Sequence, residues 1–544
     1  MHKYAAARVG ELRASVMTIS LWLPALAAFH LAPHPRRPAT TTTRHRPITS
    51  CTDERFDVVC VGGGAAGMFS AIAAARAGAS VLVLEAGSLP LRKVRISGGG
   101  RCNVMHDAQT WEASRELVAQ RYPRGADQLL GSLSSRFSPV ETKAWFEAEG
   151  VQLKVEADGR AFPTTDDSAT IIDALLGAAD TAGVVLRKRC KVAEVVRAEP
   201  AARFEVRYAR AGGEAAAAGG AALGTVRCAA LVLSTGSASH ELAASLGHQI
   251  APLVPSLFSF RLRGGGALDA SLAGVSVPDA ALTLELPQSG SSGGSSGGGR
   301  GGRGRGKGGR GRGGRGGGSL AARGPLLVTH RGVSGPAALK LSAFAAGALA
   351  DAGYAGTLHL NLLPALGASE VGDALEAFQA RDDARRKLVR NLNPFGLPTR
   401  LWEAVACGDG GGGTGEAAAA EAEAEAGVDA DLGGKRWGEL RRAELDTVRR
   451  RLVATPLPFS GKDSNKDEFV TAGGVAWKGV DARRMESKLV EGLFFAGELL
   501  DVDGVTGGHN FQSCWTTGMV AGTTAAEVAA RPMDATATAG EAET

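Results

Sequence analysis

The sequence contains no Cys-x-x-Cys pair, and its seven cysteines are dispersed along 544 residues. This spacing excludes a zinc-ribbon site and a thioredoxin-type redox motif, so no metal site is expected. Dispersed cysteines are typical of reduced thiols in an intracellular or organellar compartment. No run of about 18 uninterrupted apolar residues is present either, and we therefore expect no membrane-spanning segment.

Acidic residues are missing from Leu12 to Thr52, where arginine, serine, threonine and proline are frequent. A short apolar segment at 19–29 precedes the basic part, and this order is typical of transit sequences. The Ala-Ala-Phe sequence at 27–29 is similar to the bipartite presequences of complex plastids. We therefore expect residues 1–52 to be a disordered plastid presequence, with a mitochondrial or a cytoplasmic location as the alternatives.

Two further tracts lack the residue types that build a core. Residues 289–319 are almost entirely glycine, serine and arginine, and residues 409–431 are rich in glycine, alanine and acids. Both are expected to be insertions in a folded chain. Arginine–glycine repeats can bind RNA, so an RNA-associated protein is a rival to an enzyme. Outside the basic segments and the acidic tract the charge is close to balanced, and nucleic acid is not the expected partner.

A βαβ unit begins directly after the presequence. A β-branched run at 56–61 is followed by Gly62–Gly67, an alanine-rich helical stretch and a second apolar run at 80–84. The glycines fit the pattern G-x-G-x-x-G, which brings a pyrophosphate to a helix N-terminus. Glu85 follows the second strand, where a carboxylate accepts hydrogen bonds from the ribose hydroxyls of a dinucleotide.

Two other glycine-rich segments have the features of flavin contacts. Ser97 to Asn103 contains three successive glycines among several cations, so its backbone can lie flat against an anionic ligand. Gly492 to Gln512 predicts a strand that ends at Gly497-Glu498, then a glycine loop and a helix. Such a helix N-terminus favours negative charge at the pyrimidine edge of a flavin, and Glu498 can accept hydrogen bonds from ribityl hydroxyls.

Together with Thr329–Pro336, Thr471–Val475 and Met485–Lys488, these motifs resemble the bacterial YhiN-like flavoprotein family. The family includes BaiN-type and aminoacetone-oxidase-like enzymes, and the resemblance covers residues 56–530 outside the two tracts. It implies FAD as the cofactor. It places at the cofactor Gly62, Gly64, Ala65, Ala66, Gly67, Glu85, Ala86, Lys93, Ser97, Gly98, Gly99, Arg101, Asn103, Thr235, Gly236, Gly497, Glu498, Asp503, Gly507, Gly508, Asn510 and Phe511.

The resemblance also implies an α/β fold, that of a two-dinucleotide-binding-domain flavoprotein. A Rossmann-like FAD domain would carry a central insert domain with a β-barrel-like part and a helical part. The expected boundaries are 1–52 for the presequence, 53–250 and 471–530 for the two parts of the FAD domain, 251–470 for the insert domain with both tracts, and 531–544 for a disordered tail.

The predicted activity is that of an FAD-dependent oxidoreductase. Hydride would pass between the flavin and a small organic substrate or NAD(P)H, and NAD(P)H is the candidate electron donor. A flavin amine oxidase that uses oxygen is the alternative within enzymes. His509 is the histidine expected nearest the flavin, and it is the candidate catalytic residue.

The presequence can be tested directly. A fluorescent reporter fused after residues 1–52 is expected to enter an organelle, a plastid in our interpretation, because the acid-poor basic stretch acts as the targeting signal. The native protein should begin near residue 50 by N-terminal sequencing. A diffuse cytosolic reporter together with an intact native N-terminus would contradict the targeting hypothesis.

Overall fold

The computed structural model describes residues 54–108, 120–198, 202–211, 222–264, 267–287, 320–408, 431–463 and 470–531. The predicted presequence, the tract 289–319, and nearly all of the tract 409–431 and of the tail 531–544 lie outside these residues. Among the helices of the described ranges, none is long and apolar enough to cross a lipid bilayer.

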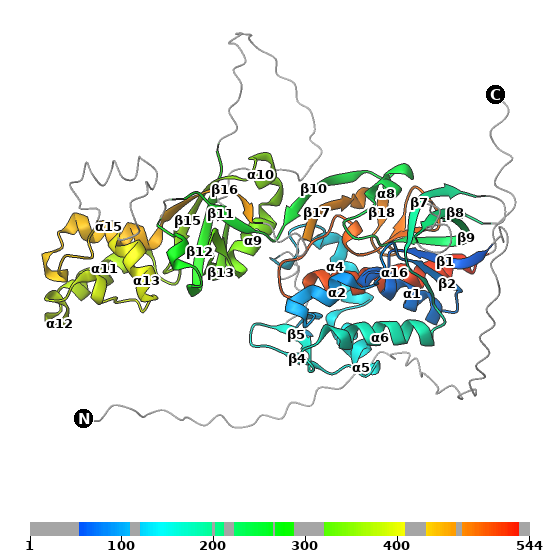
Figure 1. The fold of residues 1–544 in the computed structure, drawn as a ribbon, viewed down its shortest axis with the longest axis horizontal. Helices are drawn as coiled ribbons and strands as arrows, with labels where there is room; N and C mark the ends of the chain where they lie inside the picture. Colours follow the sequence, from blue (N-terminus) through cyan, green and yellow to red (C-terminus); the bar gives the residue numbers. More distant parts are fainter. Residues whose placement is uncertain are drawn as a thin grey trace, which may run out of the picture. The chain divides into compact units, whose positions relative to one another are not determined.

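A mixed sheet with a parallel centre organises the first part of the fold (Figure 1). In the described residues its strands run in the order β18–β19–β20–β9–β1–β2–β6, with β8 also paired to β9 and β7 paired to β8. Their bounds are β1 Arg55–Val61, β2 Val81–Leu84, β6 Val185–Arg187, β7 Cys190–Arg197, β8 Phe204–Arg210, β9 Ala222–Leu233, β18 Val480–Asp481, β19 Glu486–Ser487 and β20 Leu493–Phe495. The central strands are continuous apolar runs because helices and loops cover both faces.

The register of the central strands brings their carboxyl ends to one edge. Val61 at the end of β1 pairs with Leu84 of β2 on one side and with Leu233 of β9 on the other. Leu233 in turn pairs with Phe495 of β20. Four loops that are far apart in the sequence therefore leave the sheet side by side, which is where open α/β sheets bind ligands.

Two helices follow these strands and pack tightly against each other. Helix α1 (Ala65–Arg76) follows β1, and α16 (His509–Ala529) follows the loop after β20. A Cβ at Gly522 of α16 would lie only 2.1 Å from the carbonyl oxygen of Ser70 in α1. Glycine is therefore required for the close approach of the two helices.

The central insert contains a closed barrel, as the resemblance implies. In the described residues the barrel order is β11–β14–β13–β12–β15–β16. The bounds are β11 Ser259–Leu262, β12 Ser276–Glu285, β13 Leu320–Val328, β14 Gly332–Ser334, β15 Ala355–Asn361 and β16 Thr455–Asp463. Helices α9 (Pro336–Phe344) and α10 (Ala346–Asp351) follow β14, and α9 packs on the barrel.

A group of helices lies between β15 and β16 in the chain: α11 (Ala368–Gln379), α12 (Asp382–Arg385), α13 (Thr399–Trp402) and α15 (Arg442–Val453). Its residues share one hydrophobic core with the barrel, and the parallel sheet has a separate core. The antiparallel pair of β10 (Ile250–Ser256) and β17 (Val470–Val475) carries the chain into the insert and back.

The remaining elements surround the loop after β2. Helix α2 (Arg92–Ile96) leads into the glycine segment, and a small sheet joins β3 (Met105–His106), β5 (Arg160–Pro163) and β4 (Leu153–Val155). Helices α4 (Ala126–Ser135), α5 (Pro139–Ala148) and α6 (Ser168–Thr181) complete this part. Helix α5 begins at the N-cap Ser138, which forms a capping box with Glu141.

Substitution by alanine is expected to have opposite effects on stability at two helical glycines, because only one of them lies in the contact between α1 and α16. Gly522→Ala is expected to lower the free energy of unfolding by about 1–3 kcal/mol, because the methyl group would collide with the α1 backbone. Gly177→Ala in α6 is the control, because no atom lies within 4 Å of its Cβ position. It should raise stability by about 0.5–1 kcal/mol through helix propensity. Urea denaturation measures both, and equal stability of the two variants would contradict the packing.

Candidate functional site

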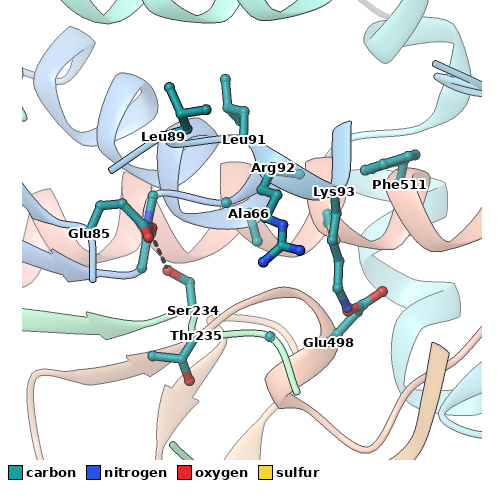
Figure 2. A pocket seen from close by; sticks show the side chains of 16 residues that line it. Ala66, Glu85, Leu89, Leu91, Arg92, Lys93, Ser234, Thr235, Glu498 and Phe511 are labelled. Atoms are coloured by element: carbon teal, nitrogen blue, oxygen red, sulfur yellow. Dashed lines mark hydrogen bonds and ion pairs between the residues drawn. The ribbon is translucent and has the colours of Figure 1, made fainter. Parts of the chain in front are cut away.

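A cavity of about 220 Å³ opens where β1, β2 and β9 end (Figure 2). It is lined by Gly62, Gly63, Gly64, Ala65, Ala66, Glu85, Leu89, Leu91, Arg92, Lys93, Ser234, Thr235, Gly236, Glu498, Phe511 and Cys514. The N-terminus of α1 therefore faces the cavity, and the free N–H groups and dipole of a helix N-terminus favour an anion. We call this space the small cavity.

The glycines of the first loop have different tasks. At Gly67 a Cβ would lie 1.9 Å from the carbonyl oxygen of Gly62 and 2.5 Å from the Ser234 hydroxyl, so this residue holds α1 against the strands. At Gly64 a Cβ would meet no protein atom within 4 Å, so the backbone there faces the open cavity. Gly62 has a φ of +104°, which favours glycine.

Glu85 is fixed at the rim of the small cavity by the backbone. Its two carboxylate oxygens accept hydrogen bonds from the N–H groups of Gly63, at 2.7 Å, and Gly87, at 2.6 Å. Each oxygen retains a further acceptor site because a carboxylate oxygen has two lone pairs. The side chain is therefore held ready to accept hydroxyl donors from a ligand.

A second cavity, of about 490 Å³, lies between the glycine segment and the start of α16. We call it the large cavity. It is lined by Lys93, Ile96, Ser97, Gly98, Gly99, Asn103, Arg160, Leu257, Leu339, Val470, Glu498, Val505, Thr506, Gly507, Gly508, Asn510 and Phe511. The N-terminus of the 21-residue helix α16 therefore faces this cavity.

Asn103 joins the glycine segment to the beginning of α16. With its amide assigned so that both groups are satisfied, it donates to the Met105 carbonyl at 3.1 Å and accepts from the Gly508 N–H at 2.9 Å. Gly508 has a φ of +87°, and a Cβ there would lie 2.4 Å from the Met105 backbone. These contacts set the position of the helix N-terminus in the cavity wall.

Lys93 and Glu498 lie where the two cavities meet. Both residues line both cavities, as does Phe511. The Lys93 ammonium and the Glu498 carboxylate form an ion pair, and Figure 2 shows the two side chains reaching toward each other. A ligand that extends through both cavities passes this pair.

Most of the predicted cofactor contacts line these cavities, but Gly67, Ala86, Arg101, Gly497 and Asp503 do not. Arg101 turns away, donates to Glu156 at 2.7 Å and lies 4.0 Å from the ring centroid of Phe162. Gly497 is packed instead, because a Cβ there would lie 2.7 Å from the side chain of Ala66.

Asp503 joins segments of the fold instead of lining a cavity. Its buried carboxylate accepts from Arg124 Nε at 2.5 Å and from the Ser256 hydroxyl at 2.8 Å. Burial raises the pKa of Asp503, and Arg124 acts in the opposite direction. The prediction that Asp503 contacts the flavin is therefore replaced by a structural role.

His509 is the first residue of α16, but its side chain is fully buried and lines neither cavity. Its ring packs 4.8 Å from that of His106, whose Nδ1 lies 3.3 Å from the Gly507 carbonyl oxygen. Burial, with His106 and Arg121 nearby, holds the pKa of His509 well below its usual range. The neutral ring packs against the Gly507–Gly508 turn on the side away from the large cavity. From this position His509 does not reach a substrate in the cavity directly.

Two buried cysteines lie close to the cavities. Burial raises the pKa of both the Cys102 and the Cys514 thiols to about 12. Both are therefore protonated near neutral pH, and thiolate chemistry is not expected of them.

The wall of the large cavity opposite the glycine segment and α16, which we call the far wall, was not predicted from the sequence. Leu257, Leu339 and Val470 come from the insert and its connections, and Arg160 comes from β5. No motif marks any of these residues. The Asp158-Gly159 turn is the one local signal nearby, and it places Arg160 at the start of a strand.

The two joined cavities fit FAD. Helix α1 and the open backbone at Gly64 suit its pyrophosphate, and Glu85 suits the ribose hydroxyls of its adenosine. Glu498 at the junction suits the ribityl hydroxyls, and the N-terminus of α16 suits the electron-rich edge of the flavin ring.

Comparison with known proteins agrees with this assignment. The chain is 26% identical over 479 residues to the ribosomal RNA dihydrouridine synthase of Escherichia coli K12, covering 85% of this chain and 96% of the relative. It is 25% identical over 473 residues to the 3-dehydro-bile acid delta(4,6)-reductase of Clostridium scindens, covering 86% and 98%.

Among solved structures, a 3-ketosteroid-delta4-(5alpha)-dehydrogenase from Rhodococcus jostii RHA1 matches with a TM-score of 0.42 and 16% identity, over 87% of this chain and 97% of that one. The family described as HI0933-like protein Rossmann domain matches residues 56–524. The chain therefore belongs to this HI0933-like, FAD-binding Rossmann family, and it is an FAD-dependent oxidoreductase.

Proposed function

We propose that this protein reduces a carbon–carbon double bond conjugated with a carbonyl group, and that its substrate is a uracil ring in RNA. The names of two relatives support the reaction class, since one is a ribosomal RNA dihydrouridine synthase and the other a delta(4,6)-reductase of a 3-dehydro-bile acid. Dihydrouridine is uridine with hydrogen added to the ring double bond beside a carbonyl. Both names therefore describe reductions of an unsaturated ring.

The reaction adds one hydride to one carbon of the double bond and one proton to the other, and it consumes two electrons. FAD, once reduced, would supply the hydride, the proton would come from the medium, and NAD(P)H is the class of donor that we propose to reduce the FAD again. The residues of this chain hold the cofactor, orient the substrate ring and exclude water.

The shape and chemistry of the large cavity carry the proposal. Its far wall is apolar, formed by Leu257, Leu339, Val470 and Val505, and an apolar wall suits the face of a planar ring. The lining of the large cavity includes two cations, Lys93 and Arg160, and Lys93 is paired with Glu498. A guanidinium at this wall can donate to the carbonyl oxygen that gains electron density during reduction.

Arg160 is held in place by its own hairpin. Its Nε donates to Asp158 at 2.7 Å, one terminal nitrogen donates to Glu156 at 3.1 Å, and the guanidinium lies 5.3 Å from the Phe162 ring centroid. These partners fix the orientation of the side chain. The other terminal nitrogen forms no hydrogen bond within the described ranges and remains as a donor. Such fixed donors act without reorganisation during the reaction.

The role of Glu498 in holding FAD gives a binding prediction. Glu498→Gln keeps the shape but loses charge-assisted hydrogen bonds worth about 1.5–3 kcal/mol, so the Kd for FAD should rise about ten- to a hundredfold. Glu491→Gln, which removes an exposed carboxylate outside both cavities, is the matched control and should retain FAD. Recovery of free-flavin fluorescence on dilution measures both. Tighter FAD binding by Glu498→Gln would show that the ion pair with Lys93 competes with the cofactor.

The reaction itself can be tested with the holoenzyme. Anaerobic NADPH or NADH should bleach the flavin spectrum, and uridine-containing ribosomal RNA should then restore it. Mass spectrometry of the digested RNA should show nucleosides heavier by two hydrogen atoms. Bleaching by amines and recovery with oxygen, without change in the RNA, would instead support the amine oxidase hypothesis.

A further inference from the structure

A basic surface lies in the helical part of the insert, outside both cavities. Figure 1 labels α12 and α15, the helices on either side of its segments in the chain. Two segments run side by side there, one directly after α12 and one just before α15. Leu388 and Arg436 form an antiparallel β-bridge, and the backbone N–H of Trp437 donates to the Lys387 carbonyl at 3.0 Å. The register brings the Arg-Arg-Lys sequence at 385–387 beside Arg436.

Arg385, Arg386 and Arg436 line one surface depression together with Asp382, Gly438 and Glu439. These three arginines and Lys387 are exposed, and within the described part of the chain none of the four has an ion pair. Neighbouring cations differ in this respect, because Arg381 pairs with Asp383 and Lys435 with Glu444. The three arginines of the depression outnumber its two carboxylates, and Lys387 adds a further positive charge beside it.

The surface is built on a fixed base. The rings of Trp402 and Trp437 are buried and stacked with centroids 6.2 Å apart, and their indole nitrogens donate to the carbonyls of Val389 and Leu392. The Gln379 amide also donates to the Trp437 carbonyl at 2.9 Å. The backbone that carries the arginines is therefore held in position before any partner binds, which lowers the entropic cost of binding.

The chemistry of the lining indicates the kind of partner. The depression has no apolar side chain, whereas the centre of a protein interface is apolar and aromatic and a membrane-binding surface inserts apolar residues. No large hydrophobic residue is exposed between 381 and 442 in the described ranges. Guanidinium groups without an acidic partner suit phosphate oxygens, which they bind through paired hydrogen bonds.

We propose that Arg385, Arg386 and Arg436, with the adjacent exposed Lys387, form a docking surface for the phosphodiester backbone of RNA. The choice of RNA rests on the proposed function, because a reductase of a base in folded RNA needs contacts beyond the cavity that receives the ring. Phosphate contacts of this kind position the nucleic acid without reading its sequence. The surface therefore increases affinity and sets orientation, and the large cavity selects the base.

The test compares three full-length holoenzymes. The first is wild type, the second carries Arg385→Gln, Arg386→Gln and Arg436→Gln, and the third carries Lys478→Gln, Arg483→Gln and Lys488→Gln. The control triple removes the same charge from exposed positions outside the depression. The tracts 289–319 and 409–431 are present in all three proteins, so their contribution to binding cancels.

Fluorescence anisotropy with a labelled ribosomal RNA hairpin should show a Kd about 10–100 times higher for the first triple than for wild type at 100 mM salt. The slope of log Kd against log salt should fall by about two to three, roughly one for each lost phosphate contact. The control triple should bind within about twofold of wild type.

The outcomes separate the two proposals. Equal Kd and salt slope for the first triple and wild type, or an equal loss in the control triple, would overturn the docking surface. Absence of RNA binding by wild type, with binding to anionic lipid vesicles that the first triple abolishes, would also overturn it. RNA binding that depends on the surface, without dihydrouridine formation by wild type, would support the docking surface and contradict the proposed function alone.

Discussion

The parallel pairing of four strands is the constraint on which the site depends. Because β2, β1, β9 and β20 are paired in parallel, Glu85, Gly62, Ser234 and Gly497 all follow strand ends at the same edge of the sheet. The four positions span more than 400 residues of sequence, and the hydrogen-bond register alone brings them together. The close approach of α1 and α16 then aims two helix N-termini at adjoining cavities.

The buried ion pair of Asp503 and Arg124 connects this sheet to the insert. Asp503 belongs to the loop after β20, Arg124 precedes α4, and Ser256, which donates to Asp503, ends β10. Arg124 also donates to the Ala343 carbonyl of α9 at 3.0 Å. A buried carboxylate needs such partners, since one left alone would carry a large desolvation cost. One charged cluster thus holds together the elements that supply both walls of the large cavity.

The division between the two cavities follows from this arrangement. The dinucleotide-binding side combines the exposed backbone of the glycine loop with the carboxylate of Glu85, which suits a cofactor recognised through phosphates and hydroxyls. The opposite side has apolar residues from the insert and its connections, with Arg160 of β5 beside them, which suits a variable substrate. A family with one cofactor and several substrates can change the second wall without changing the first.

The sequence by itself determined the elements whose signals are local. The βαβ unit, the glycine loop with Glu85, and the strand–loop–helix after residue 492 were all recognisable, because strand and helix periodicity and glycine spacing are properties of short segments. Only the tertiary structure decided the directions of side chains in loops and the composition of the far wall. Asp503 turns toward Arg124, Arg101 toward Glu156 and His509 toward His106, each because its partner comes from a distant segment. Leu257 and Leu339 reach the cavity because the insert is attached to the sheet there, and no pattern near them in the sequence records that attachment.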